Sequence, residues 1–313
     1  MHNPGGVKVR ERRHFPRGRA RFQAVFGSIF GGSSRQLKRA AAITLAAFFL
    51  PAAPAAGILP ADVAAASAPA GPGPALWVVQ DADTTIFLFG TFHALDSNPS
   101  WFNRSVRAAF HAADQLVLET LVPENPAELQ SVIARQVATS EPKAGQPVFL
   151  TGRPQSFVAS AGQAMSAGRA MGMSIENGAD AVLRRAANAH GKPVAGLESF
   201  EFQLRMFAAL PPPGRGQARR SGSMGGVIGD MQSAWKRGDN AGFAAVLGDV
   251  RTHSPLAYKM LFADRNANWA GWIARRLAQP GTVFVAVGTG HLVGPDSVQH
   301  QLAQRGISSI RVS

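Results

Sequence analysis

The chain has 313 residues, no cysteine, 46% hydrophobic residues and a formal net charge of +13. This length is enough for one large domain with a buried core. The missing cysteines exclude disulfides, thiolate metal ligands and a cysteine nucleophile. Residues 1–40 hold ten Lys and Arg against one Glu, whereas the other 273 residues hold 22 against 18. A nucleic-acid-binding surface needs its basic charge on the folded domain, so we expect no nucleic-acid partner.

Residues 1–55 have the pattern of a basic leader with a secretory signal peptide. RQLKR at 35–39 is basic, AAAITLAAFFL at 40–50 is apolar, and small residues follow Pro51. The apolar run is shorter than the ~20 residues of a membrane span. We therefore expect an exported protein, periplasmic or extracellular, that touches the membrane only through its leader, whether the leader is cleaved or retained as a tether. Residues 56–75 are rich in Ala and Pro and predict a linker, which leaves 76–313 as the folded domain.

Short apolar strands alternate with helices along this domain. Strands are predicted at 76–80, 84–89, 115–119, 193–197, 283–287 and 307–312, the first two forming a hairpin. Helices are predicted at 101–113, 126–138, 154–171, 178–190, 199–209, 228–237, 240–249, 255–278 and 295–305, with an exposed loop at 211–226. This order predicts an α/β fold, with a mostly parallel central sheet, helices on its faces and a helical middle region over about 126–278.

Two distant segments share one pattern. IFLFGTFH at 86–93 and FVAVGTGH at 284–291 are both apolar strands that end in Gly-Thr-x-His. We expect each glycine to let the chain turn sharply, so that His93 and His291 lie just beyond the carboxyl ends of their strands. Ligands of open parallel sheets bind at that edge.

Two acids end strands in the same way: Glu119 follows QLVL, and Glu198 follows PVAGL. If these strands are parallel neighbours, the two histidines and two carboxylates meet at one edge of the sheet. Such a set could bind a divalent metal that activates water. It could equally act as a metal-free general acid and base. Glu198 could also do no more than cap the following helix.

The paired G-x-x-H motifs resemble those of the TraB/GumN family, which includes the Tiki-type membrane proteases and is distantly similar to erythromycin-esterase-like and ChaN-like proteins. The likeness covers about 76–313. It is supported by LVLET, GADAVLRRAANAHGKPVAGLES, Gln203, WKRGD, DRNANW and VGTGHLVGPDSVQHQLAQRGI.

This resemblance implies an erythromycin-esterase/ChaN-like fold and a metal-dependent hydrolase, for example a peptidase, acting on a peptide or other envelope substrate. It nominates His93, Glu119 and His291 as ligands of a divalent metal (Mn, Co or Zn). It also nominates Glu119, Glu198 and Arg265 as catalytic residues. Arg265 could orient a carboxylate or bind an anionic transition state, or it could form a buried structural ion pair. The alternatives are a non-catalytic accessory or binding protein in cell-envelope or exopolysaccharide assembly, and a metal-free His/Glu esterase-like enzyme.

Overall fold

The computed structural model describes residues 73–139, 166–211 and 224–313. The predicted leader, most of the predicted linker and most of the predicted helix at 154–171 lie outside the described residues.

The described residues form one six-stranded sheet in the order β4-β3-β5-β2-β1-β6. Four neighbouring strands are parallel: β4 (Val194–Glu198), β3 (Gln115–Thr120), β5 (Gly281–Gly288) and β2 (Thr84–Thr91). β1 (Leu76–Gln80) pairs antiparallel with β2, and β6 (Ile310–Arg311) pairs antiparallel with β1. The predicted hairpin and the mostly parallel sheet are thus confirmed.

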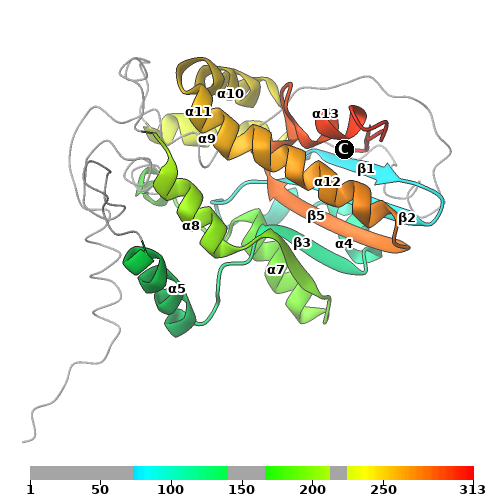
Figure 1. Ribbon diagram of the computed structural model, residues 1–313, viewed down its shortest axis with the longest axis horizontal. Helices are drawn as coiled ribbons and strands as arrows, with labels where there is room; N and C mark the ends of the chain where they lie inside the picture. The colour runs from blue at the N-terminus through cyan, green and yellow to red at the C-terminus, as the bar shows by residue number, and fades with distance from the viewer. Residues whose placement is uncertain (1–72, 140–165, 212–223) are drawn as a thin grey trace, which may run out of the picture.

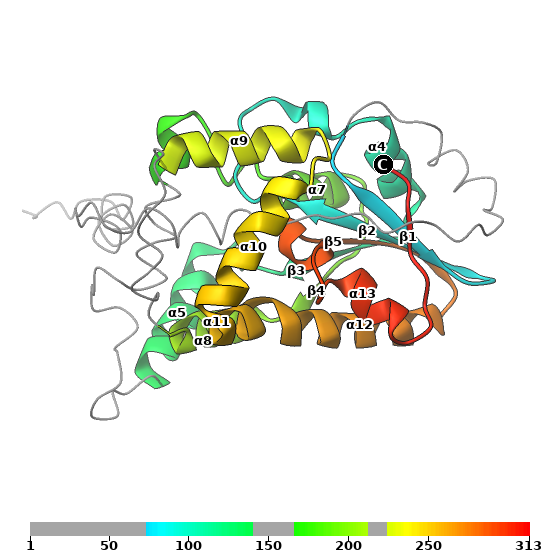
Figure 2. The ribbon, with the colours of Figure 1, turned by 90° about the horizontal axis from the view of Figure 1, so that it is seen from above.

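Helices cover both faces of the sheet, as Figure 2 shows. One face carries α4 (Arg104–Ala112), α7 (Ala179–Ala189) and α9 (Met224–Lys236), and the other carries α8 (Phe200–Ala209), α12 (Asp264–Leu277) and α13 (Val298–Ala303). α5 (Pro126–Thr139) lies beside α8, and α10 (Ala241–His253) spans from one layer to the other (Figures 1 and 2). In the described part, the middle of the chain is helical apart from β4, as expected.

The central strands are buried on both faces, which explains their apolar sequences. Ile86, Phe87, Leu88 and Phe89 of β2 are each at most 1% exposed. A strand covered by helices on both sides has no polar face, so it reads as an unbroken apolar run. Every side chain of this run contributes to the core, which fixes the position of the strand's carboxyl end.

Some boundaries differ from the prediction. α4 begins after Asn103, whose side chain accepts a hydrogen bond from the Val106 amide, and a short 3-10 turn, η1 (Pro99–Trp101), precedes it. α9 begins at Met224, before the predicted end of the loop at 211–226, and the rest of that predicted loop, 212–223, lies outside the described residues.

The predicted helix at 255–278 is divided into α11 (Pro255–Tyr258), a π-helical turn η2 (Lys259–Ala263) and α12. Such turns insert one residue into a helix and are frequent at functional sites. None of the helices in the described ranges is long and apolar enough to cross a lipid bilayer.

Candidate active site

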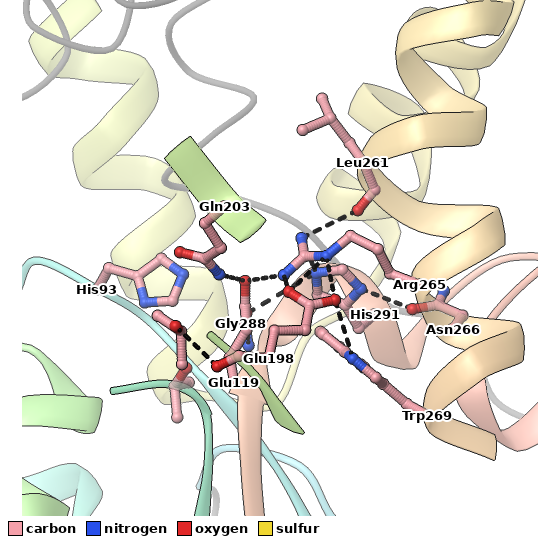
Figure 3. Close-up of polar contacts among 12 residues, drawn as sticks. His93, Glu119, Glu198, Gln203, Leu261, Arg265, Asn266, Trp269, Gly288 and His291 are labelled. Atoms are coloured by element: carbon pink, nitrogen blue, oxygen red, sulfur yellow. Dashed lines mark hydrogen bonds and ion pairs between the residues drawn. The ribbon is translucent and has the colours of Figure 1, made fainter. Parts of the chain in front are cut away.

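The parallel strands bring the predicted residues to one edge of the sheet. Thr91 pairs with Gly288 in the register of β2 and β5, so the two Gly-Thr-x-His segments leave the sheet at the same level. His93, Glu119 and His291 all line one pocket of about 520 Å³ beyond the carboxyl ends of the strands. Figure 3 shows His93 and His291 on opposite sides of Glu119.

The motif glycines permit close approach and do not turn the chain. Gly288 has φ −49° and ψ 127°, a conformation open to most residues, and Gly90 is not among the glycines with positive φ. A Cβ at Gly90 would lie 2.5 Å from Thr289 Oγ1. A Cβ at Gly288 would lie 3.0 Å from both Glu119 Oε2 and His93 Nε2. The expected sharp turn is therefore wrong, and Gly288 instead keeps open a small space between two polar atoms.

His93 is held by a carboxylate that the sequence analysis did not nominate. Its Nδ1 lies 2.7 Å from Asp180 Oδ2, while Asp180 Oδ1 accepts a hydrogen bond of 2.7 Å from Thr91. Asp180 lies in the first turn of α7, where an acid is ordinarily explained by the helix dipole, so its sequence position gave little signal. A Cβ at Gly178 would overlap the His93 carbonyl, so this glycine lets α7 approach the histidine.

The charge of Asp180 determines the protonation of His93. Burial alone lowers the pKa of His93, but the charge and hydrogen bond of Asp180, with help from Glu119, raise it to about 9. His93 therefore carries a proton at neutral pH. Because Asp180 occupies Nδ1, the other ring nitrogen, Nε2, is the one that faces Gly288 and Glu119.

The two carboxylate oxygens of Glu119 differ in how fully protein hydrogen bonds occupy them. Oε1 accepts hydrogen bonds from Arg265 Nη2 at 2.5 Å and Gln203 Nε2 at 3.0 Å. Oε2 accepts a hydrogen bond of 2.9 Å from the Gly288 amide, lies 3.8 Å from His291 Nε2, and faces the space beside His93. Burial raises the pKa of Glu119, but the positive charge of Arg265 outweighs it and holds the pKa far below its usual range. Glu119 is thus an ionised carboxylate fixed on the pocket wall.

Arg265 is buried and uses all its donors within the protein. Nε and Nη2 both donate to Glu198, at 2.8 and 2.6 Å, and Nη2 also donates to Glu119. Nη1 lies 3.2 Å from both the Leu261 carbonyl oxygen and His291 Nε2. A guanidinium has five N–H groups, and these five hydrogen bonds, to four residues, use all of them (Figure 3). Arg265 therefore orients carboxylates and has no donor left for a substrate.

Glu198 lies behind this arginine. Its side chain is 9% exposed, accepts a further hydrogen bond of 3.0 Å from Trp269 Nε1, and is absent from the pocket lining. Burial raises the pKa of Glu198 against the opposing effect of Arg265. Its contacts are those of a residue that positions Arg265. Trp269 and Arg265 both belong to the DRNANW segment, of which the family resemblance nominated only Arg265.

His291 is buried and neutral. Nδ1 lies 2.6 Å from Asn266 Oδ1 and donates to it, which leaves Nε2 to accept from Arg265. Burial and the nearby guanidinium hold the pKa of His291 well below 6.5. The two histidines of the paired motif therefore differ: His93 carries a proton towards the pocket, and His291 is fixed within the hydrogen bonds of Arg265.

The nominated ligands His93, Glu119 and His291 do not fit a divalent metal in this arrangement. Arg265 donates to the Nε2 lone pair of His291 and contacts Glu119, so a permanent positive charge lies beside two of the three ligands. A metal ion would have to displace these hydrogen bonds and approach that charge. Across 73–139, 166–211 and 224–313, no group of three or more His, Cys, Asp or Glu side chains could hold a metal ion.

The fold and the site define an α/β protein with a pocket at the carboxyl edge of a mostly parallel sheet, lined by His93, Glu119 and Arg265 among other residues. The model of the TraB/PrgY/gumN family matches residues 75–149 and 127–311, and the chain belongs to this family. Comparisons with curated proteins and with solved structures give no match. The likeness to erythromycin-esterase and ChaN-like folds therefore stays a prediction.

Proposed function

We propose that this chain is a hydrolase that cleaves an ester or amide bond with His93 as general acid and Glu119 as general base. The observation that carries the proposal is the small space at Gly288, which has His93 Nε2 on one side and Glu119 Oε2 on the other. Both atoms lie at the wall of a pocket large enough for a small substrate. A proton donor and a proton acceptor that face one space are the requirement for general acid–base catalysis.

The proposed reaction balances with one water molecule. Glu119 Oε2 accepts a proton from water as its oxygen attacks the carbonyl carbon of the substrate. His93 Nε2 donates its proton to the leaving oxygen or nitrogen, the bond from that atom to the carbonyl carbon breaks, and an acid and an alcohol or amine result. The proton on Glu119 then returns to His93 through solvent. Asp180 favours the protonated form of His93 throughout.

The test uses the purified full chain on a panel of p-nitrophenyl esters and fluorogenic peptides, with chelator and with added Mn, Zn or Co. We expect hydrolysis that survives the chelator and is lost in His93→Gln and Glu119→Gln, assayed at a temperature at which circular dichroism shows both variants to be folded. His300→Gln, a change at an exposed histidine, is the matched control.

Three outcomes would overturn the proposal in different ways. Hydrolysis that needs an added metal, with stoichiometric metal lost in His93→Gln, favours a metal-dependent hydrolase. Absence of hydrolysis across the panel in the folded chain, with both variants rescuing a deletion strain, favours a non-catalytic accessory protein of the cell envelope. Hydrolysis that persists in both variants places the chemistry elsewhere.

We also propose that the chain acts outside the cytoplasm. The support is the order of basic, apolar and small residues at 35–55. Fusing residues 1–75 to a reporter that is active only after export tests this. An inactive reporter contradicts export, and N-terminal sequencing of the exported form would give the cleavage site.

A further inference from the structure

The pocket wall away from His93 and Glu119 is mostly apolar. Val122, Ile175, Phe207, Leu261 and Phe262 line it, from the segment after β3, the approach to α7, α8 and the π-helical turn η2. Val122 and Ile175 are 40% and 45% exposed, so part of this apolar surface faces solvent. An apolar group of a ligand that bound here would remove this surface from water.

Two arginines of α7 line the same pocket, and they differ in their contacts. Arg184 is held in place, since it pairs with Glu124 at 2.7 Å and donates to the Val122 carbonyl oxygen at 2.6 Å. Arg185 is exposed, and within the described ranges no carboxylate lies within ion-pair distance of it. Arg185 therefore has a charge and a planar set of donors that are open to a ligand.

The helix fixes the spacing between this charge and the proposed catalytic residues. Asp180, Ala181, Arg184 and Arg185 all line the pocket, as expected for positions on one side of a helix. At 1.5 Å per residue, Arg185 lies roughly 7–8 Å along α7 from Asp180, which holds His93.

From these three features we infer that the acyl half of the substrate has an apolar chain that ends in a carboxylate, which Arg185 binds. The inference rests on the proposed hydrolase function and deepens it. The apolar chain contacts the wall at Val122 and Ile175, the carboxylate accepts hydrogen bonds from Arg185, and the carbonyl lies beside His93 and Glu119. Arg185 is a specificity residue in this arrangement and takes no part in bond cleavage.

The experiment compares two esters of equal chain length on the purified full chain: p-nitrophenyl hexanoate and the p-nitrophenyl half-ester of adipate. We expect the wild-type KM for the adipate half-ester to be about tenfold lower, at similar kcat, because one charge-assisted pair distinguishes the two. Arg185→Gln should remove the preference, and Arg185→Lys should retain part of it. Arg104→Gln, a change at an exposed arginine of α4, should leave it intact.

Binding of the two products, adipate and hexanoate, separates this inference from the proposed function. If the chain hydrolyses both esters equally, or if Arg185→Gln keeps the preference for the adipate half-ester, Arg185 does not bind the substrate carboxylate. The proposed hydrolase function is unaffected by that result. If neither ester is cleaved, the proposed hydrolase function loses its support, and the affinities for adipate and hexanoate then test whether Arg185 binds a carboxylate. If adipate binds more tightly than hexanoate and this difference is lost in Arg185→Gln, the carboxylate-binding role of Arg185 is supported. Equal binding of the two acids contradicts that role.

Discussion

Replacing Gly288 by alanine fills the space on which the proposed chemistry depends. The added methyl group would lie 3.0 Å from both Glu119 Oε2 and His93 Nε2, closer than ordinary van der Waals contact. The backbone conformation of Gly288 suits alanine, so the cost arises from crowding alone, and a few tenths of an ångström of movement by each neighbour is needed. We expect a loss of about 1–2 kcal/mol in the free energy of unfolding.

The effect of Gly288→Ala on activity should be far larger. The methyl group occupies the space that the attacking water needs, so water and substrate must bind elsewhere, and a misplacement of reacting groups by about 1 Å can reduce a rate roughly a hundredfold. We therefore expect kcat to fall by about that factor or more, while the melting temperature falls by only a few degrees. Gly248→Ala is the matched control, because it lies within α10 with open space around its Cβ and should stabilise the helix slightly at unchanged activity. A folded Gly288→Ala enzyme with wild-type kcat/KM would refute the reasoning.

Three further predictions concern the residues around this space. The pKa of His93 is raised from 6.5 to about 9, so the stabilisation of the fold by its pairing with Asp180 is complete below pH 6.5 and is lost as the pH rises through about 9. Activity should fall over the same pH window. In Asp180→Asn, the pH–rate profile should show this fall at a lower pH. Arg265→Met leaves two buried carboxylates uncompensated and should cost about 3–5 kcal/mol in urea unfolding, with only partial recovery in Arg265→Lys; a loss under 1 kcal/mol would contradict the buried pairing. Gly90→Ala places a methyl group 2.5 Å from Thr289 Oγ1 and should lower the melting temperature in calorimetry more than Gly288→Ala does, because Cα and Cβ of Thr289 also lie 3.3 Å away.

The fold could be predicted because its signals are local. An unbroken apolar run such as Ile86–Phe89 can be satisfied only where helices cover both faces, and the alternation of such runs with helices leaves few topologies. The edge at which His93 and Glu119 meet followed from the parallel direction of their strands. The π-helical turn at Lys259–Ala263 gave no signal, since one inserted residue alters the hydrogen bonds without changing the apolar pattern.

The roles within the site could not be predicted in the same way. The two motif histidines have similar sequence surroundings, yet Asp180 raises the pKa of His93, while Asn266 and Arg265 hold His291 neutral. Asp180 is 87 residues from His93, and no spacing rule connects them. Whether His93, Glu119 and His291 bind a metal ion or form hydrogen bonds and ion pairs around Arg265 likewise depends on where Arg265 lies in three dimensions.

The hydrogen bonds divide the site into a fixed part and an open part, and this division indicates where chemistry can occur. All five donors of Arg265 are used, and both oxygens of Glu198 accept from Arg265 or Trp269. A substrate could engage them only by displacing a buried partner, which costs more than one new hydrogen bond returns. His93 Nε2 and Glu119 Oε2 instead face a space that a single methyl group would fill. Arg265 lowers the basicity of Glu119 but holds it ionised and in place, so a substrate meets a preformed donor and acceptor and need not reorganise the buried charges.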